Sequence, residues 1–253
     1  DKREQIESLP FYLLKDEGDM LSTHYDVVII GAGPAGLATA IATAEKAKLK
    51  ILVVDQHTPD FQRVGENIPP ETLILLQQLG LENQFLQDGH EACPGFASVW
   101  GKEGVGYNDF IVNPYGHSWR LNRQMFDRSM QTRARELGVE VLWQSRFIKA
   151  DKLKGSSQYA YEICLQTQMH DVCLVQANFV VDASGSAARF AKSLKVKKIV
   201  DDKLIALVRF ASLKQSAKGK QVRIEATQLN WCYHTLLPDQ KVVSMLIAER
   251  NDR

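Results

Sequence analysis

Three glycines stand at the spacing G-x-G-x-x-G directly after a short apolar run. They are Gly31, Gly33 and Gly36, within "YDVVIIGAGPAGLATAI". In a loop that binds a pyrophosphate, each position has its own physical requirement. Gly31 permits a tight turn, Gly33 lets the backbone approach the phosphates, and Gly36 lets the following helix pack close to the strand. The pattern therefore predicts a dinucleotide-binding loop.

Two neighbouring features fit the same interpretation. Pro34 directly precedes the predicted helix and Ala35 begins it, and the free N–H groups and positive partial charge of this helix end favour phosphate oxygens. Asp55 follows a second apolar run, "ILVV", where a carboxylate can accept hydrogen bonds from ribose hydroxyls. The same charge would repel a 2′-phosphate, so an NADP-type nucleotide is disfavoured at this site.

A strand, a helix and a second strand must position these residues. Residues 25–30 are β-branched and apolar, as in a parallel strand buried on both faces. Residues 35–48 predict an alanine-rich helix, and residues 51–54 predict the second strand. A lone glycine pattern also marks ordinary turns. Here the strand, helix, strand and terminal acid fall in register, which favours the nucleotide site.

The rest of the chain predicts further helices and many strands. Helices are predicted over 70–79, 123–137 and 187–194, the second with Asn122 as its N-cap and Gly138 as its C′ glycine. Strands are predicted over 95–101 and 107–112, in a β-meander over 139–184 (139–150, 159–167 and 171–184), and over 204–210, 222–227, 231–237 and 241–247. A simple nicotinamide dehydrogenase would continue with alternating strands and helices, so the meander disfavours that class.

Composition argues against several other classes. The 31 basic residues nearly cancel the 30 acidic ones, so no long-range field attracts nucleic acid or an anionic membrane. Cys93, Cys164, Cys173 and Cys232 are scattered, which predicts buried thiols in a reducing compartment and no metal or iron–sulfur site. No signal peptide is recognisable, and no apolar run approaches the roughly 18–20 residues that span a bilayer. We therefore expect a cytoplasmic protein.

Five segments occur in an order that is typical of one superfamily. They are "GAGPAG" followed by Ala40, "RVGENIPP", "WRLNRQMFD", "VVDASGSAAR" and "EATQLNWCYHTLLPD". From about residue 24 to its end, the chain resembles the flavoprotein monooxygenases and flavin-dependent halogenases. In that resemblance Arg123 matches an arginine that contacts the flavin nucleotide, and Asp182 and Gly185 match the second FAD motif. The resemblance implies an α/β fold: a Rossmann-like FAD-binding domain with a β-meander, plus the start of a β-rich substrate domain.

The resemblance implies FAD as the cofactor. The residues expected to bind it are Gly31, Gly33, Pro34, Ala35, Gly36, Asp55, Arg63, Arg123, Asp182 and Gly185. Arg63 and Arg123 could instead be solvated charges, and Asp182 could simply close a turn.

Two residues are candidates for catalysis. Glu66 could otherwise be a helix-start acid favoured by the dipole, and His117 could be a satisfied loop histidine. Trp100, Trp119 and Trp231 are expected in the core, or as walls of an aromatic substrate pocket.

The implied chemistry is oxygen insertion or halogenation. In the superfamily, reduced flavin reacts with dioxygen to give a flavin hydroperoxide, which attacks an electron-rich, often aromatic, substrate. Halogenases of this group need a lysine on the strand that corresponds to 95–101; that segment has none, and Lys102 lies just beyond it. Trp231, Tyr233 and Pro238 are present without the tight W-x-W-x-I-P pattern. These departures favour hydroxylation over halogenation.

Substrate and partners are implied only through resemblance. "GENIPP", "GHEACPGFASVWG" and "YGHSWRLNR" look most like halogenase-like flavoproteins that accompany oxidases or dehydrogenases with tryptophan-derived quinone cofactors. The implied substrate is a small aromatic molecule or a tryptophan of a partner protein, with NAD(P)H or a flavin reductase as electron source. An NAD-dependent dehydrogenase and a non-catalytic module that binds a partner protein stay open as alternatives.

We expect three regions along the chain. They are an N-terminal extension over 1–23, an FAD-binding domain over 24–200 with inserted substrate-domain strands at about 95–115, and part of a substrate-binding sheet over 201–253. Superfamily members carry a third flavin motif, a Gly-Asp pair before a helix. The only such pair here, Gly18-Asp19, precedes the first strand. We therefore expect a fragment or a truncated relative.

Overall fold

A computed structural model describes residues 22–101, 104–154, 158–168, 171–213, 221–238 and 240–249. The predicted roles of Gly18-Asp19, of Lys102 and of most of the N-terminal extension lie outside these residues. The chain forms two compact units, each made from two stretches of sequence. Unit 1 contains the residues up to Phe61 together with Met130–Lys198, and unit 2 contains Gln62–Ser129 and the residues from Ile199 onward. The predicted domain limits stay a prediction, because compactness alone does not define a domain that folds independently.

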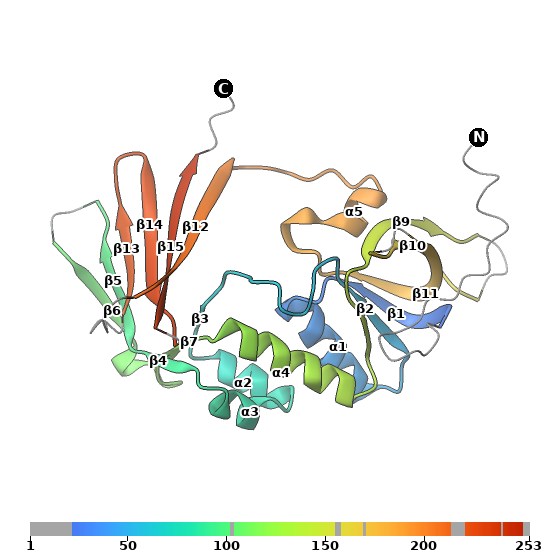
Figure 1. Cartoon of the computed structure of the whole chain (residues 1–253), viewed down its shortest axis with the longest axis horizontal. Helices are drawn as coiled ribbons and strands as arrows, with labels where there is room; N and C mark the ends of the chain where they lie inside the picture. Colours follow the sequence, from blue (N-terminus) through green and yellow to red (C-terminus); the bar gives the residue numbers. More distant parts are fainter. Residues whose placement is uncertain are drawn as a thin grey trace. The chain divides into compact units, whose positions relative to one another are not determined.

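Unit 1 is built on a six-stranded sheet. Its strands are β1 (His24–Ile30), β2 (Ile51–Val54), β8 (Glu140–Leu142), β9 (Arg146–Lys152), β10 (Tyr161–Gln166) and β11 (Val172–Asp182). In the sheet they stand in the order β8-β2-β1-β11-β10-β9. The first four in this order run parallel to one another, and β11, β10 and β9 form an antiparallel meander that Figure 1 shows at one end of the unit. The predicted Rossmann-like sheet with a β-meander is therefore confirmed.

One predicted strand is wrong. Residues 139–150 were expected to form a single strand of the meander, but the structure divides them into β8 and β9, which lie at opposite edges of the sheet. The break falls at Gln144, whose φ is +52°. Its N–H donates to the carbonyl of His57, and the N–H of Ser145 donates to the carbonyl of Asp55. These bonds to the loop after β2 turn the chain away from a strand path.

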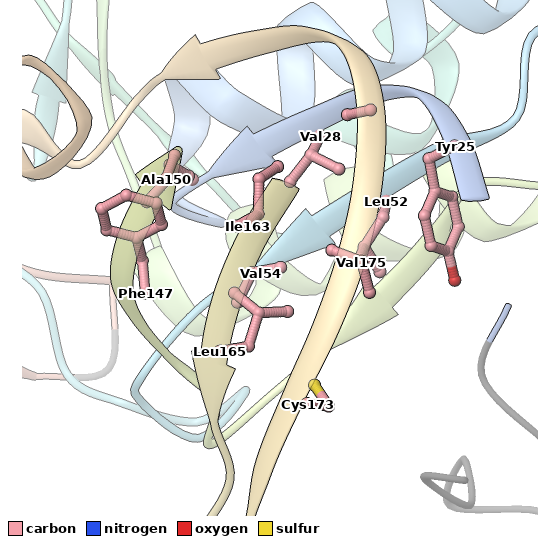
Figure 2. Close-up of a cluster of buried hydrophobic side chains, with 12 residues drawn as sticks. Tyr25, Val28, Leu52, Val54, Phe147, Ala150, Ile163, Leu165, Cys173 and Val175 are labelled. Atoms are coloured by element: carbon pink, nitrogen blue, oxygen red, sulfur yellow. The ribbon is translucent and has the colours of Figure 1, made fainter. Parts of the chain in front are cut away.

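One face of this sheet carries a continuous apolar core. Figure 2 shows Val28 of β1, Leu52 and Val54 of β2, and Ile163 and Leu165 of β10 gathered in it, and all five are at most 1% exposed. Because side chains alternate along a strand, the residues between them, such as Ile29 and Val53, point to the other face. Burial of each such side chain stabilises the fold by about 1.5–3 kcal/mol.

Two helices complete unit 1. α1 (Pro34–Lys46) connects β1 to β2 and contacts both strands, and its buried residues include Leu37 and Ile41. α5 (Arg189–Ser193) contacts β9 and β11, and its Phe190 packs on the apolar core. A 3-10 turn over Gly185–Ala187 precedes α5, so the helix predicted over 187–194 is present but shorter.

Unit 2 holds a second six-stranded sheet. Its strands are β5 (Gly95–Val99), β6 (Gly106–Asp109), β12 (Leu204–Ser212), β13 (Val222–Ala226), β14 (Asn230–Leu236) and β15 (Lys241–Glu249). They stand in the order β12-β15-β14-β13-β5-β6, and all neighbours are antiparallel except β13 and β5. Each strand predicted in this part of the chain is present, with shifted ends, and its β-rich character is confirmed.

The strand predicted over 107–112 ends early. After β6 the chain enters a 3-10 turn over Phe110–Val112. There the N–H of Phe110 donates to the carbonyl of Pro94, and the Phe110 ring packs edge-on against Phe96 with 5.9 Å between centroids. This inward packing ends the strand path.

A small sheet and three helices complete unit 2. The sheet, in the order β3-β7-β4, was not predicted; its strands are β3 (Asn67–Ile68), β7 (Ser118–Arg120) and β4 (Glu91–Cys93). The helices are α2 (Thr72–Gln78), α3 (Glu82–Gln87) and α4 (Arg123–Glu136), and the boundary between the units falls within α4.

The predicted ends of α4 are confirmed. The side-chain oxygen of Asn122 accepts the N–H of Met125, and Gly138 has a φ of +79° just past the helix. No helix in the described part of the chain combines the length and the apolar character that crossing a membrane requires.

Candidate functional site

The loop between β1 and α1 needs two of its glycines for packing. Gly31 has a φ of +112°, and a Cβ there would lie 2.4 Å from the carbonyl oxygen of Ala183. A Cβ on Gly36 would lie 1.9 Å from the carbonyl oxygen of Gly31. Larger residues at either position would force the helix and the strand ends apart. The tight turn and the close helix packing expected of these residues are both present.

Gly33 differs, because a Cβ there would meet no described atom within 4 Å. It is the N-cap residue of α1 and is followed by Pro34. Within the described residues no side chain caps this helix end, and the N–H groups of Ala35 and Gly36 have no acceptor within the helix. An open backbone beside unpaired donors fits a pyrophosphate.

Asp55 is tied into the same loop. It is 7% exposed, and its Oδ2 accepts the backbone N–H of Ala32 at 2.8 Å. Its Oδ1 accepts the backbone N–H of His57 and lies 2.9 Å from Nδ1 of that ring. The predicted ribose contact stays a prediction, and the structure adds a role in shaping the loop.

Asp182 closes a turn at the end of β11. Its Oδ1 accepts the hydroxyl of Ser184 at 2.6 Å and the N–H of the same residue at 3.2 Å, and its Oδ2 accepts the N–H of Ala191 at 3.0 Å. Burial alone would raise the pKa of this carboxyl, but the hydrogen bonds outweigh it and hold the pKa below the ordinary value. Gly185 follows with a φ of +63°. The predicted flavin contacts of both residues stay predictions.

In unit 2, Arg123 supports the loop after Gln62. Its Nη1 donates to the carbonyls of Val64 and Gly65, and its Nη2 donates to Asp127 at 3.1 Å. Arg63 lies 4.0 Å from the same carboxylate. A Cβ on Gly65, whose φ is +106°, would lie 2.8 Å from Nη1 of Arg123. Nε of Arg123 is buried without a partner among the described residues, and the predicted nucleotide contact stays a prediction.

Glu66 is the candidate catalytic residue that the structure places in a pocket. The pocket has a volume of about 360 Å³ and is formed within unit 2. Its apolar walls are Pro69, Phe96, Phe110 and Met245, and its remaining lining residues are Gly65, Glu66, Asn67 and Tyr233.

The pocket contains unusual polar atoms. Glu66 is 2% exposed; its Oε2 accepts the N–H of Gly65 at 3.0 Å, and its Oε1 has no partner among the described residues. Nδ2 of Asn67 is likewise buried without a partner in the described part of the chain. Burial, and then the nearby charge of Glu66, raises the pKa of the Tyr233 hydroxyl, which therefore stays protonated.

His117 is placed differently. Its Nδ1 lies 2.9 Å from the carbonyl of Ser118, and its ring packs edge-on against Trp119. It does not line the pocket that contains Glu66. These contacts favour a satisfied loop histidine. Trp100 was expected in the core or as the wall of a substrate pocket. It is 56% exposed, so it is not a core residue, and it lines a second, open hollow of about 820 Å³ together with Trp231.

Among the residues that line the pocket, sequence analysis named only Glu66 as a site candidate and Tyr233 as part of a motif; it did not single out Gly65, Asn67, Pro69, Phe96, Phe110 or Met245. Phe96 and Met245 lie on strands that were predicted, but nothing local in the sequence reports which strands become neighbours. Cys93 and Cys173 are buried free thiols, as expected, and Cys164 and Cys232 are half-buried. Within the described residues, no group of His, Cys, Asp and Glu could hold a metal ion.

Comparison with known proteins supports a flavin function. A family model described as "FAD binding domain" matches residues 24–253. The FAD-dependent oxidoreductase LodB of Marinomonas mediterranea is 24% identical over 220 residues, which cover 87% of this chain and 58% of that protein. A brominase of Pseudoalteromonas luteoviolacea, which acts on 1H-pyrrole-2-carbonyl-[peptidyl-carrier protein], is 30% identical over 161 residues, covering 64% of this chain and 37% of the relative.

A solved structure shows the same fold. The myxobacterial chondrochloren halogenase CndH superposes with a TM-score of 0.78 at 22% identity, covering 90% of this chain and 54% of that one. The chain thus spans little more than half the length of these relatives, and less of the brominase.

Proposed function

The chain belongs to the FAD binding domain family, and from this membership we propose that it is part of a monooxygenase that hydroxylates an electron-rich aromatic substrate. The observation that carries the proposal is the unit 2 pocket, which aromatic and apolar residues line together with Glu66, a buried acid whose Oε1 has no partner among the described residues. Apolar pockets with a few converging polar groups are typical of small-molecule sites.

The residues of unit 1 would hold the adenine side of FAD. The N–H groups of Ala35 and Gly36 would bind the pyrophosphate, and Asp55 would accept a ribose hydroxyl. Gly33 leaves the space that the phosphates need. Arg63, Arg123, Asp182 and Gly185 are proposed as further contacts. When bound, the flavin supplies the redox and oxygen chemistry. The protein binds and orients the flavin and the substrate, and it excludes water from the site.

The overall reaction takes one oxygen atom of dioxygen into the substrate and the other into water. Two electrons and two protons are required, and we propose NAD(P)H or a separate flavin reductase as their source. The proposed substrate is a small aromatic molecule or a tryptophan side chain of a partner protein. The near-zero net charge favours neither nucleic acid nor a membrane as a partner.

Halogenation is the second candidate. A relative named as a brominase favours it, as does the fold shared with the halogenase CndH. The absence of lysine from β5, "GFASV", argues for hydroxylation.

Turnover by the full-length protein separates these functions. The purified protein would be supplied with FAD, a flavin reductase, NADH, indole and ¹⁸O-labelled dioxygen, with and without bromide. A product that carries ¹⁸O supports the monooxygenase, whereas a brominated product supports the halogenase. Failure to bind FAD, together with no oxygenated or brominated product beyond a control with the reductase alone, would support a non-catalytic module.

A further inference from the structure

We propose that β12 is a dimer interface, at which it pairs in antiparallel fashion with β12 of a second copy of this chain. The pairing is centred on Val208 and joins two six-stranded sheets into one continuous sheet. The inference goes beyond the proposed function, because it concerns assembly and needs neither FAD nor a substrate. Three features of β12 carry it: an unpaired edge, two apolar faces and a self-complementary register.

The first feature is the backbone edge. β12 ends the strand order of the unit 2 sheet, and among the described residues it pairs with β15 alone. The backbone N–H and C=O groups on its outer side therefore have no ladder partner in the described part of the chain. All nine residues match β15 one to one, so no bulge twists the edge away. β12 thus offers a long, regular edge to a further strand.

The opposite edge of the same sheet is better protected. β6 has only four residues, and they include Gly106 and Asp109. Short edge strands and charged side chains both discourage pairing with another chain. β12 is more than twice as long, contains no proline and carries a single charge, that of Arg209. This difference makes β12, rather than β6, the edge that is open to a partner.

The second feature is apolar exposure on both faces of the strand. Leu204 and Val208 share one face and are 52% and 39% exposed. Ile205 and Leu207 share the other face and are 40% and 61% exposed. A partner strand with one polar face would leave one of these pairs without apolar neighbours. A second β12 supplies apolar side chains on both faces, and cross-strand contacts between them stabilise the pairing.

The third feature is the register. A two-fold axis through Val208, perpendicular to the sheet, uses all nine residues of the strand. Residues of one face then lie opposite residues of the same face, because the pairing preserves the alternation of side chains. Arg209 lies opposite Leu207 of the partner subunit, so no like charges stand directly opposite one another. The contact is identical from both sides, and it closes at two copies.

Sedimentation velocity of the full-length protein over a range of concentrations tests the assembly. We expect a reversible dimer. Hydrogen exchange of β12 amides, followed by mass spectrometry, should slow as the dimer forms, because the outer N–H groups acquire partners. A protein that stays monomeric up to its limit of solubility would overturn the proposal. Open-ended assembly would overturn it too, and so would a dimer in which β12 exchanges as fast as in the monomer.

Charge changes at Leu207 test the register. Leu207→Lys places a cation opposite Arg209 of the partner subunit, twice in each dimer, whereas Leu207→Glu places an acid there. Like charges directly opposite repel and unlike charges attract, so Leu207→Glu should dimerise about tenfold more tightly than Leu207→Lys. Adding Arg209→Glu to Leu207→Lys should restore the dimer. Because Leu207 is 61% exposed, we expect these variants to fold, which thermal unfolding would verify.

Tyr107→Lys is the matched control. It introduces the same charge at a 65% exposed residue of β6, on the other edge of the same sheet, and should dimerise as the unmodified protein does. Loss of the dimer in Tyr107→Lys alone would move the interface to β6 and overturn the proposal. Equal dimer affinities of Leu207→Lys and Leu207→Glu would contradict the register. The measurements on the unmodified protein decide the proposal even if a variant does not fold.

Discussion

The backbone N–H of Ala32 donates a 2.8 Å hydrogen bond to the buried carboxylate of Asp55. This bond joins the end of β2 to the middle of the glycine loop after β1. The acid that the sequence marks as a ribose contact therefore also fixes the loop that would bind the pyrophosphate. One side chain couples two parts of the proposed nucleotide site, and its loss should affect both.

Asp55→Asn should weaken FAD binding by about tenfold or more and lower the free energy of unfolding by about 1–3 kcal/mol. The amide keeps the size of the side chain but presents an N–H₂ group to one of two backbone donors, Ala32 N–H or His57 N–H. Titration of flavin fluorescence and urea unfolding measure the two effects. Asp171→Asn, at an exposed residue of the same unit, is the control. A variant with unchanged affinity would show that Asp55 does not shape the site.

Alanine at Gly36 and at Gly33 should separate folding from binding. At Gly36 the new Cβ would lie 1.9 Å from the Gly31 carbonyl, so we expect a loss of stability of about 3 kcal/mol or more. At Gly33 the Cβ meets no described atom within 4 Å, so stability should change little while FAD binding weakens, because the methyl group occupies space that the phosphates need. Thermal unfolding and FAD titration of both variants test this. Full FAD affinity in Gly33→Ala would place the pyrophosphate elsewhere.

Local signals explain what the sequence could predict. The first strand, the glycine turn, the first helix and the second strand follow from residues within one stretch, because sterics at Gly31 and apolar periodicity act locally. Asn122 and Gly138 likewise marked the ends of α4 correctly, since a helix cap is satisfied by its immediate neighbours.

Non-local pairing explains what it could not. The run 139–150 has strand character throughout, yet β8 pairs with β2 and β9 pairs with β10. The bonds of Gln144 and Ser145 to the loop after β2 decide this, and they join residues that are far apart in the sequence. The pocket depends on the same kind of information. Phe96 and Tyr233 both line the pocket because β5 and β14 both pair with β13. No local sequence pattern indicates that β13 pairs in parallel with β5.

Arg123→Ala should loosen the loop around Val64 and Gly65. The guanidinium donates to both carbonyls of that loop and to Asp127, so its removal frees the backbone and leaves a carboxylate that is 7% exposed with fewer partners. Limited proteolysis followed by mass spectrometry should show faster cleavage near residue 64. The control variant Arg128→Ala, changed at an exposed residue of the same helix, should be cleaved by the protease at the same rate as the unmodified protein. Equal rates in both variants would remove Arg123 from this structural role.

The turn held by Asp182 should make stability depend on pH in a defined direction. The hydrogen bonds from Ser184 and Ala191 keep the folded-state pKa of Asp182 below its ordinary value of 3.8. The folded protein therefore binds this proton less readily than the unfolded chain does. The ionised carboxylate stabilises the fold above about pH 3.8, and its contribution is lost as the pH falls through the lowered folded-state pKa.

Asp182→Asn should thus lower the free energy of unfolding by about 1 kcal/mol at neutral pH, and the difference from the unmodified protein should shrink in the acid range. Urea unfolding at a series of pH values measures it, without added FAD so that cofactor binding does not contribute. Asp171→Asn, whose carboxylate is exposed, should show a small difference at every pH. A deficit in Asp182→Asn that stays constant down to the lowest pH would mean that the carboxylate's charge does not stabilise the turn. The amide's donors would then cause the loss.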